Sequence, residues 1–208
     1  MRDRDAVLLR DVEQYYSGRL REHGPTALGV DWNSAESQRL RFEQLARLWE
    51  GEAGMINLID YGCGYGALLD FLDGRGTPVK YQGYDVSPAM VEAASRRAAP
   101  DRTFTSQHAT LARADWVVAS GIFNVRLKQD DGAWTAYMRR AVADLASLGR
   151  RGFAFNALTS YADQDKQRQD LYYADPGYWF DLCKRAHSPK VTLLHDYALY
   201  EFTILVRL

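Results

Sequence analysis

Residues 56–69 read Ile-Asn-Leu-Ile-Asp-Tyr-Gly-Cys-Gly-Tyr-Gly-Ala-Leu-Leu. This short apolar run breaks at three glycines on alternate positions and resumes at helical spacing, a pattern that predicts a buried strand, a turn and an amphipathic helix. Glycines let such a turn bend tightly and approach a ligand that a Cβ atom would push away. The amides at the N-terminus of the following helix then offer hydrogen-bond donors to a polar or anionic group.

A second segment, residues 81–88, reads Tyr-Gln-Gly-Tyr-Asp-Val-Ser-Pro, and its Asp85 follows Gly66 by 19 residues. An acidic residue at the end of the next strand lies where a ribose would arrive, and a carboxylate accepts hydrogen bonds from both ribose hydroxyls. The glycine turn, with Asp60 before it and Asp85 after it, therefore predicts a site for a nucleoside-bearing cofactor.

Three segments together resemble the class I S-adenosylmethionine-dependent methyltransferases. Asp60-x-Gly62-Cys63-Gly64-x-Gly66 resembles their cofactor loop, and Gly83-x-Asp85-x-Ser87-Pro88-x-Met90 resembles their ribose-binding second motif. Residues 115–124, Asp-Trp-Val-Val-Ala-Ser-Gly-Ile-Phe-Asn, are similar to their fourth-strand motif, which borders the methyl-transfer site. The matches fall in the family's order and cover roughly residues 56–125, whereas the C-terminal third carries no motif of one subfamily.

Strands and helices alternate along the chain and end in a strand pair, which predicts an α/β fold with a mostly parallel sheet. We expect strands at 56–61, 79–84, 103–106, 116–120, 152–157, 191–195 and 199–206, and helices at 67–72, 88–99, 133–148 and 176–186. The resemblance, and not the pattern, supplies a Rossmann-like seven-stranded sheet of order 3-2-1-4-5-7-6, with its last strand antiparallel and helices on both faces.

Residues 1–50 form a predicted helical extension before a core of residues 51–208, within a single domain overall. The first helix runs from about Asp5 to Glu22 and stops at His23-Gly24-Pro25. The second begins at a cap, Asn33 or Ser34, and reaches about residue 50. In similar enzymes such extensions lie over cofactor and substrate, so we expect either a lid or simple packing at the sheet edge.

The resemblance implies a role for each cofactor-loop position. Asp60 would accept from the α-amino group, Asp85 would hold the ribose hydroxyls, and Cys63 would be a small packing residue. His108 and Ala109 stand where the family often has an acidic residue that binds adenine, so a side chain here, Gln107 included, or a backbone amide would make that contact. The full implied set is Asp60, Gly62, Cys63, Gly64, Gly66, Asp85, Val86, Met90, His108, Ala109, Ser120 and Gly121, with Met90 equally readable as core.

Methyl transfer is an in-line displacement at an activated sulfonium, so the enzyme need only position a nucleophile, exclude water and, where necessary, take a proton. The sequence shows no decisive base, and the candidates are His23, Asn124, Arg126 and Tyr161. The expected acceptor-binding residues are Tyr16, His23, Asn124, Arg126, Asn156 and Tyr161, in an aromatic-walled pocket with Tyr172, Tyr173, Tyr178 and Trp179. Each has an alternative interpretation as a helix end, a packing residue or a surface charge.

The composition argues against several partner classes. The 208 residues carry 26 basic and 27 acidic side chains, which argues against a strongly electrostatic nucleic-acid or membrane partner. Two distant cysteines suggest neither a disulfide framework nor a metal site. We see no signal segment and no run of the roughly 18 apolar residues of a membrane span, so we predict a cytoplasmic protein. The oligomeric state stays open.

The fourth motif continues Ser120-Gly121-Ile122-Phe123, which differs from the Asn/Asp-Pro-Pro-Tyr/Phe of amino-methylating DNA and protein-glutamine enzymes. With no visible RNA-binding module, we expect methylation of an oxygen or nitrogen of a small organic acceptor. Two alternatives remain: a non-catalytic, regulatory protein that binds S-adenosylmethionine, and an NAD(P)-dependent oxidoreductase. The latter typically carries Gly-x-Gly-x-x-Gly, a spacing that residues 62–66 do not show.

Overall fold

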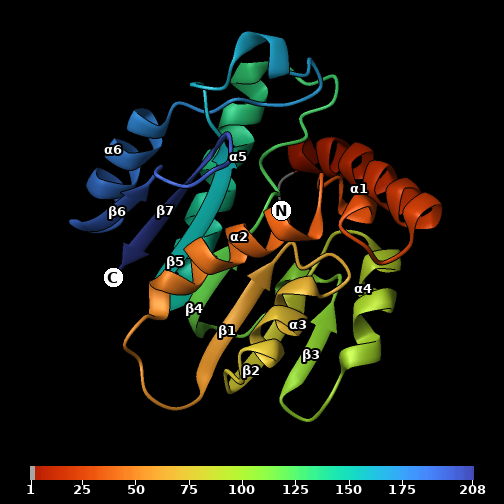
Figure 1. The fold of residues 1–208 in the computed structure, drawn as a ribbon, viewed down its shortest axis with the longest axis vertical. Coiled ribbons are helices and arrows are strands. Elements are labelled where there is room, and N and C mark those ends of the chain that lie inside the picture. Colours follow the sequence, from red (N-terminus) through yellow and green to blue (C-terminus); the bar gives the residue numbers. More distant parts are fainter. Residues whose placement is uncertain (1–2) are drawn as a thin grey trace.

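A computed structural model describes residues 3–208 and contains a seven-stranded sheet of order β3-β2-β1-β4-β5-β7-β6 (Figure 1). The strands are β1 (Ile56–Tyr61), β2 (Val79–Tyr84), β3 (Arg102–Thr105), β4 (Ala114–Ala119), β5 (Gly149–Leu158), β6 (Lys190–Leu194) and β7 (Glu201–Arg207). β7 runs antiparallel to β5 and β6, and the remaining pairs are parallel. The predicted strand order and antiparallel last strand are therefore confirmed.

Six α-helices within the described residues surround this sheet: α1 (Asp3–His23), α2 (Ala35–Ala46), α3 (Ala67–Gly74), α4 (Pro88–Ala94), α5 (Asp131–Leu148) and α6 (Pro176–Ala186). Short 3-10 turns are η1 (Leu28–Val30), η2 (Arg47–Trp49), η3 (Ser95–Arg97), η4 (His108–Thr110) and η5 (Gln164–Lys166). Most boundaries lie within two residues of the sequence prediction, and some differ by more. The helix expected over 88–99 ends as α4 and η3, and β5 begins three residues early because Gly149 already pairs with Ala114.

The sheet separates two hydrophobic clusters, because successive side chains of a strand point to opposite faces. Ile59 of β1 belongs to the cluster under α1, α5 and α6, whereas its neighbour Leu58 belongs to the cluster under α2 and α3. In β4, Val117 and Val118 divide in the same way. Both faces of the central strands are thus buried, as expected of a parallel sheet covered on both sides.

The N-terminal helices pack where the strands end. Figure 1 shows α1 across the carboxyl ends of β1 and β3. Its Ser17 hydroxyl lies 2.8 Å from the Ser87 hydroxyl in a buried contact that ties α1 to the start of α4. Of the two candidate caps for α2, Ser34 is the one that accepts from the Ser37 amide, at 3.1 Å. The predicted extension includes residues 1 and 2, which lie outside the described part, and its lid role stays a prediction.

Candidate active site

The glycine-rich loop between β1 and α3 adopts a backbone that other residues rarely adopt. Gly62, Gly64 and Gly66 have φ values of 86°, 53° and 91°. A Cβ atom at Gly62 would lie 2.1 Å from Ile122 Cγ2, so this position requires glycine for space as well as conformation. The amides of Gly62 and Cys63 both donate to the Tyr84 carbonyl, at 2.7 and 2.9 Å, which fixes the loop against the end of β2.

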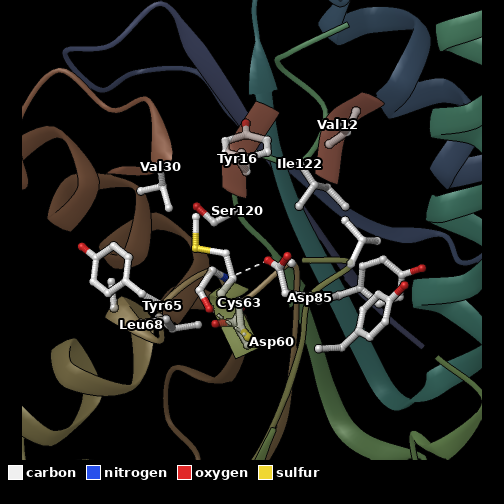
Figure 2. Close-up of a pocket in the computed structure, with 18 of the residues that line it drawn as sticks. Val12, Tyr16, Val30, Asp60, Cys63, Tyr65, Leu68, Asp85, Ser120 and Ile122 are labelled. Carbon is white, nitrogen blue, oxygen red and sulfur yellow. Dashed lines mark hydrogen bonds between the residues drawn. The ribbon is translucent and has the colours of Figure 1, made fainter. Parts of the chain in front are cut away.

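Asp85, immediately after β2, closes the other side of this loop. One carboxylate oxygen accepts from the Gly64 amide at 2.8 Å (Figure 2), and the other accepts from the Ser87 amide at 2.9 Å. Burial raises the pKa of Asp85 to about 6, and the two amides partly oppose that rise. Each oxygen of a carboxylate offers about two lone-pair sites, so both retain capacity for further hydroxyl donors.

Asp60, in β1, lies deeper and is only 2% exposed. The Tyr81 hydroxyl donates to its Oδ2. Burial raises the pKa of Asp60 to about 7; the Tyr81 hydrogen bond opposes the rise and the charge of Asp85 adds to it. A cation bound beside Asp60 would favour its ionised form, because an opposite charge within a few ångströms stabilises a carboxylate.

A cavity opens over the loop, and Figure 2 shows Val12, Tyr16 and Ile122 across it from Asp60 and Cys63. Nine of the predicted cofactor residues line it: Asp60, Gly62, Cys63, Gly64, Asp85, Val86, Met90, Ser120 and Gly121. Burial raises the pKa of the Cys63 thiol well above its ordinary range, so this side chain stays protonated and suits the packing interpretation.

Three predicted cofactor residues do not line this cavity. Gly66 caps α3, and its Cα faces Arg97. His108 lies behind the wall, with its ring 5.7 Å from that of Tyr61 and 5.6 Å from that of Tyr84, both of which do line the cavity. Ala109 is exposed on η4. None of these three lines the cavity; for His108 and Ala109 the reason is their place on η4, after β3. Their contact with the cofactor stays a prediction.

Apart from the nine residues above and Tyr16, sequence reasoning missed the residues that line this cavity. The missed residues are Leu9, Val12, Val30, Trp32, Gln38, Phe42, Tyr61, Tyr65, Ala67, Leu68, Tyr84, Ile122 and Tyr137. One signal was present in the sequence. Gln38 and Phe42 stand four residues apart on α2, so they share a helix face.

A second cavity adjoins the first, and the two share Tyr16, Val30, Trp32 and Gly121 as lining residues. Trp32 packs directly on Gly121, where a Cβ atom would lie 2.3 Å from the indole ring. The Arg41 guanidinium also lies over the Trp32 ring, 3.8 Å from its centre. Trp32 is therefore held in place between the two cavities.

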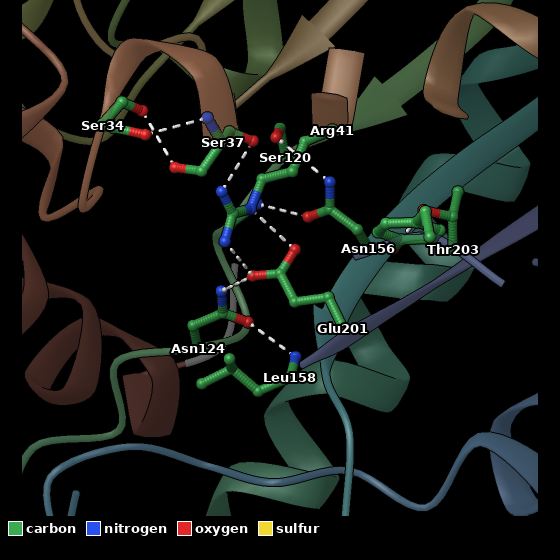
Figure 3. A network of polar contacts seen from close by, with 11 residues as sticks. Ser34, Ser37, Arg41, Ser120, Asn124, Asn156, Leu158, Glu201 and Thr203 are labelled. Carbon is green, nitrogen blue, oxygen red and sulfur yellow. Dashed lines mark hydrogen bonds and ion pairs between the residues drawn. The ribbon is translucent and has the colours of Figure 1, made fainter. Parts of the chain in front are cut away.

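Arg41 belongs to a buried polar network at the end of the sheet (Figure 3). Its Nε and Nη2 donate to the two Glu201 oxygens at 2.7 and 2.9 Å, and Asn124 Nδ2 donates to the same carboxylate at 3.0 Å. Asn124 Oδ1 accepts from the Leu158 amide at 3.1 Å. Asn156 Oδ1 accepts from the Gly121 amide at 2.8 Å. Both asparagines are thus occupied in fixing the backbone around the cavities, and only Asn124 lines one of them.

The other predicted acceptor residues are dispersed. Tyr16 lines both cavities, as expected of a residue at their junction. Arg126 lines neither, because it binds the carbonyls of Leu171 and Gln129 and pairs with Asp131.

His23 ends α1 away from both cavities, and Tyr161 is 74% exposed, with its ring 5.7 Å from that of His195. Arg126, His23 and Tyr161 thus line neither cavity, in contrast to the expected placement, and their role in binding the acceptor or taking a proton stays a prediction. Of the expected aromatic wall, only Tyr173 lines the second cavity. Tyr172, Tyr178 and Trp179 line neither, and Trp179 is in the core.

Two further properties concern residues 3–208 alone. None of the helices there is long and apolar enough to cross a membrane. In the same part of the chain, no group of three or more His, Cys, Asp or Glu side chains is arranged to hold a metal ion.

Comparison with known proteins agrees with this geometry. Residues 32–177 match a family model described as a methyltransferase domain. A protein of Mycobacterium tuberculosis that is named a putative methyltransferase is 55% identical over 157 residues, which cover 74% of this chain and 95% of that protein.

Solved structures share the fold at low identity. The magnesium protoporphyrin IX methyltransferase of Synechocystis PCC 6803, with bound S-adenosylhomocysteine, has a TM-score of 0.67 at 14% identity and 99% coverage of both chains. The N-methyltransferase NodS of Bradyrhizobium japonicum WM9, in complex with S-adenosylhomocysteine, has a TM-score of 0.66 at 17% identity, covering 94% of this chain and 97% of its own.

These findings exclude the oxidoreductase and the non-catalytic alternatives in favour of an enzyme of the predicted family. The glycine loop, the paired Asp60 and Asp85, and the sheet order all fit S-adenosylmethionine as cofactor. The chain belongs to the methyltransferase-domain family and is a class I S-adenosylmethionine-dependent methyltransferase.

Proposed function

We propose that this enzyme transfers the methyl group of S-adenosylmethionine to an oxygen or nitrogen of a small organic acceptor in the second cavity. The observation that carries the proposal is the junction of the two cavities at Tyr16, Val30, Trp32 and Gly121. A ligand in each cavity would meet its neighbour there, and a methyl donor and its acceptor must be in contact for transfer.

The residues of the first cavity would hold the cofactor in the roles that its chemistry requires. Asp85 offers free lone pairs to the ribose hydroxyls, and Asp60 offers a carboxylate to the α-ammonium group. When bound, S-adenosylmethionine supplies an already activated methyl group. The protein's remaining tasks are to orient the acceptor, exclude water and accommodate a proton.

The charges around the second cavity favour an uncharged acceptor, because its charged lining residues have partners within the protein. Arg41 pairs with Glu201, and Arg168 pairs with Asp31 at 3.2 Å and with Asp170. Lys166 pairs with its neighbour Asp165 at 3.2 Å. The rest of the lining is largely apolar or aromatic, with Tyr16, Trp32, Tyr173 and Tyr200 as the rings. A neutral, ring-bearing molecule suits such walls.

Tyr16 is the side chain at the junction best placed to orient the acceptor. Burial raises its pKa above the ordinary value, and the nearby Asp31 carboxylate adds to that rise. The hydroxyl therefore stays protonated at neutral pH. Its proposed role is to hydrogen-bond the acceptor and orient the acceptor's nucleophilic atom. The proton that this atom loses on methylation leaves to solvent.

The test is formation of S-adenosylhomocysteine by the purified enzyme across a panel of neutral aromatic alcohols, phenols and amines. Turnover with at least one acceptor is expected. Tyr16→Phe should lower kcat, measured at saturating cofactor, by roughly tenfold, the effect of one lost hydrogen bond of about 1.4 kcal/mol. Tyr178→Phe is the matched control, because that residue lies on α6 and lines neither cavity. Methylation of nucleic acid or protein, with no small molecule accepted, would overturn the proposed acceptor class.

A further inference from the structure

Gln38 is an unusual residue for the inner face of α2. Its side chain lines the first cavity, and the residue is only 7% exposed. The Tyr65 hydroxyl donates to Gln38 Oε1 at 3.2 Å. Within residues 3–208, the amide nitrogen Nε2 of Gln38 has no hydrogen-bond acceptor. Nε2 is not among the fully enclosed side-chain atoms that lack a partner, and Gln38 lines the cavity, so its N–H groups are available to a ligand there.

The cavity needs neutral donors of this kind. Among the described residues, those that line it include two carboxylates, Asp60 and Asp85, and no lysine, arginine or histidine. S-adenosylmethionine carries an α-carboxylate as well as its ammonium and sulfonium groups. Without a cation in the wall, that carboxylate must be bound by uncharged donors. Gln38 Nε2 provides two N–H groups, and the Tyr65 hydroxyl, which donates its one proton to Gln38 Oε1, orients that amide.

The position of the pair also fits the amino-acid end of the cofactor. In the view of Figure 2, Tyr65 lies on the side of Asp60 away from Asp85. With Asp85 at the ribose and Asp60 at the α-ammonium, the next group along the cofactor is its carboxylate. Tyr65 and Gln38 therefore lie at the end where this group would arrive.

Both side chains are held on anchored elements. The Tyr65 carbonyl accepts from Arg97 Nη1 at 2.8 Å, and Arg97 pairs with Asp70 of α3. Three residues after Gln38 on α2, Arg41 is fixed by its buried pair with Glu201. Such anchoring presents the free amide of Gln38 with little loss of side-chain entropy on binding.

We propose that Gln38 and Tyr65 form the subsite for the α-carboxylate of the cofactor. This assignment rests on the proposed function, since it deepens the account of the same cavity. It also makes the N-terminal extension part of the cofactor site, because Gln38 lies within it.

The experiment compares calorimetric binding of S-adenosylmethionine with that of decarboxylated S-adenosylmethionine, which lacks only the carboxylate. The wild-type protein should bind the carboxylated form at least tenfold more tightly, about the contribution of one hydrogen bond to a charged group. Gln38→Ala should lower this ratio by roughly tenfold. Gln38→Glu should lower it further, because its carboxylate repels only the ligand that carries one.

Gln44→Glu supplies the matched control, since Gln44 is on the same helix but lines neither cavity, and its ratio should equal that of the wild type. Tyr65→Phe is a second, milder variant, expected to lower the ratio a few-fold even if the Gln38 variants fold poorly. Equal weakening of both ligands by Gln38→Glu, or an unchanged ratio in Tyr65→Phe, would overturn the subsite. Failure of the wild-type protein to bind either ligand would instead overturn the cofactor assignment on which the subsite rests.

Discussion

The buried ion pair between α2 and β7 predicts a large loss of stability when Arg41 is replaced by methionine. The Arg41 and Glu201 side chains are 8% and 1% exposed, and their atoms approach to 2.7 Å. In Arg41→Met, Glu201 would keep the Asn124 donor but lose its counter-ion (Figure 3). Removing one partner of such a pair costs about 3–5 kcal/mol, because it leaves an uncompensated buried charge.

The second substitution separates this charge effect from lost packing. In the double variant Arg41→Met with Glu201→Gln, the uncharged amide can still accept from Asn124, so most of the lost stability should return. The coupling energy between the two positions is expected to be about 2 kcal/mol. Urea denaturation, followed by tryptophan fluorescence and circular dichroism, measures each free energy of unfolding.

Wild-type stability in Arg41→Met would contradict the reasoning. So would simple addition of the two single losses in the double variant, since addition implies that the two side chains do not interact.

Three other consequences follow from the same site. Cofactor affinity, measured by calorimetry, should rise as the pH increases through 6 and 7. The reason is that burial raises the pKa of Asp85 to about 6 and of Asp60 to about 7, and only ionised carboxylates attract the cationic cofactor. A flat profile would contradict this, and Asp60→Asn should remove the part of the rise near pH 7. The stability of the cofactor-free protein should fall as the pH rises from the ordinary aspartate value of 3.8 through 7, because the folded state keeps these protons longer; urea midpoints that rise instead would refute the assignment. Gly62→Ala should cost roughly 1–3 kcal/mol and abolish cofactor binding, because its φ of 86° is strained for alanine and the new methyl meets Ile122, whereas Gly74→Ala, with open space around it, should change stability by less than about 1 kcal/mol in thermal melts.

The cofactor loop could be predicted because its information is local. Three glycines at alternate positions indicate a loop with positive φ angles, and Asp85 directly follows the neighbouring strand. Strand order is different. It depends on which apolar surfaces meet after crossovers, which the pattern of strands and helices does not encode, so the order came from the resemblance alone.

The errors at the acceptor side have a common physical cause. Asn124 and Asn156 do lie near the carboxyl ends of strands, where ligands gather in this type of sheet. Backbone amides and a buried carboxylate also lie at this edge, and they need polar side chains such as asparagine as hydrogen-bond partners. Glu201 lies 77 residues from Asn124, so the hydrogen bond between them could not be predicted from the sequence around residue 124.

The missing lining residues reflect long-range packing as well. Trp32 and Gln38 acquire their positions only when the N-terminal extension folds over the loop. On α2, Gln38, Arg41 and Phe42 share a helix face, but that face mixes polar and apolar groups. An amphipathic pattern is therefore weak there, although the mixture is itself what a ligand-binding face would show.

The central claim is that the first cavity binds S-adenosylmethionine through Asp85, and calorimetric titration of the wild-type protein and Asp85→Asn tests it most directly. The account predicts that the wild type binds S-adenosylmethionine and S-adenosylhomocysteine but not NADH. Asp85→Asn should bind both cofactor forms about 100-fold more weakly, since hydrogen bonds to a charged group contribute about 1.5–3 kcal/mol each. Equal affinity in a folded Asp85→Asn variant, or binding of NADH alone, would contradict it.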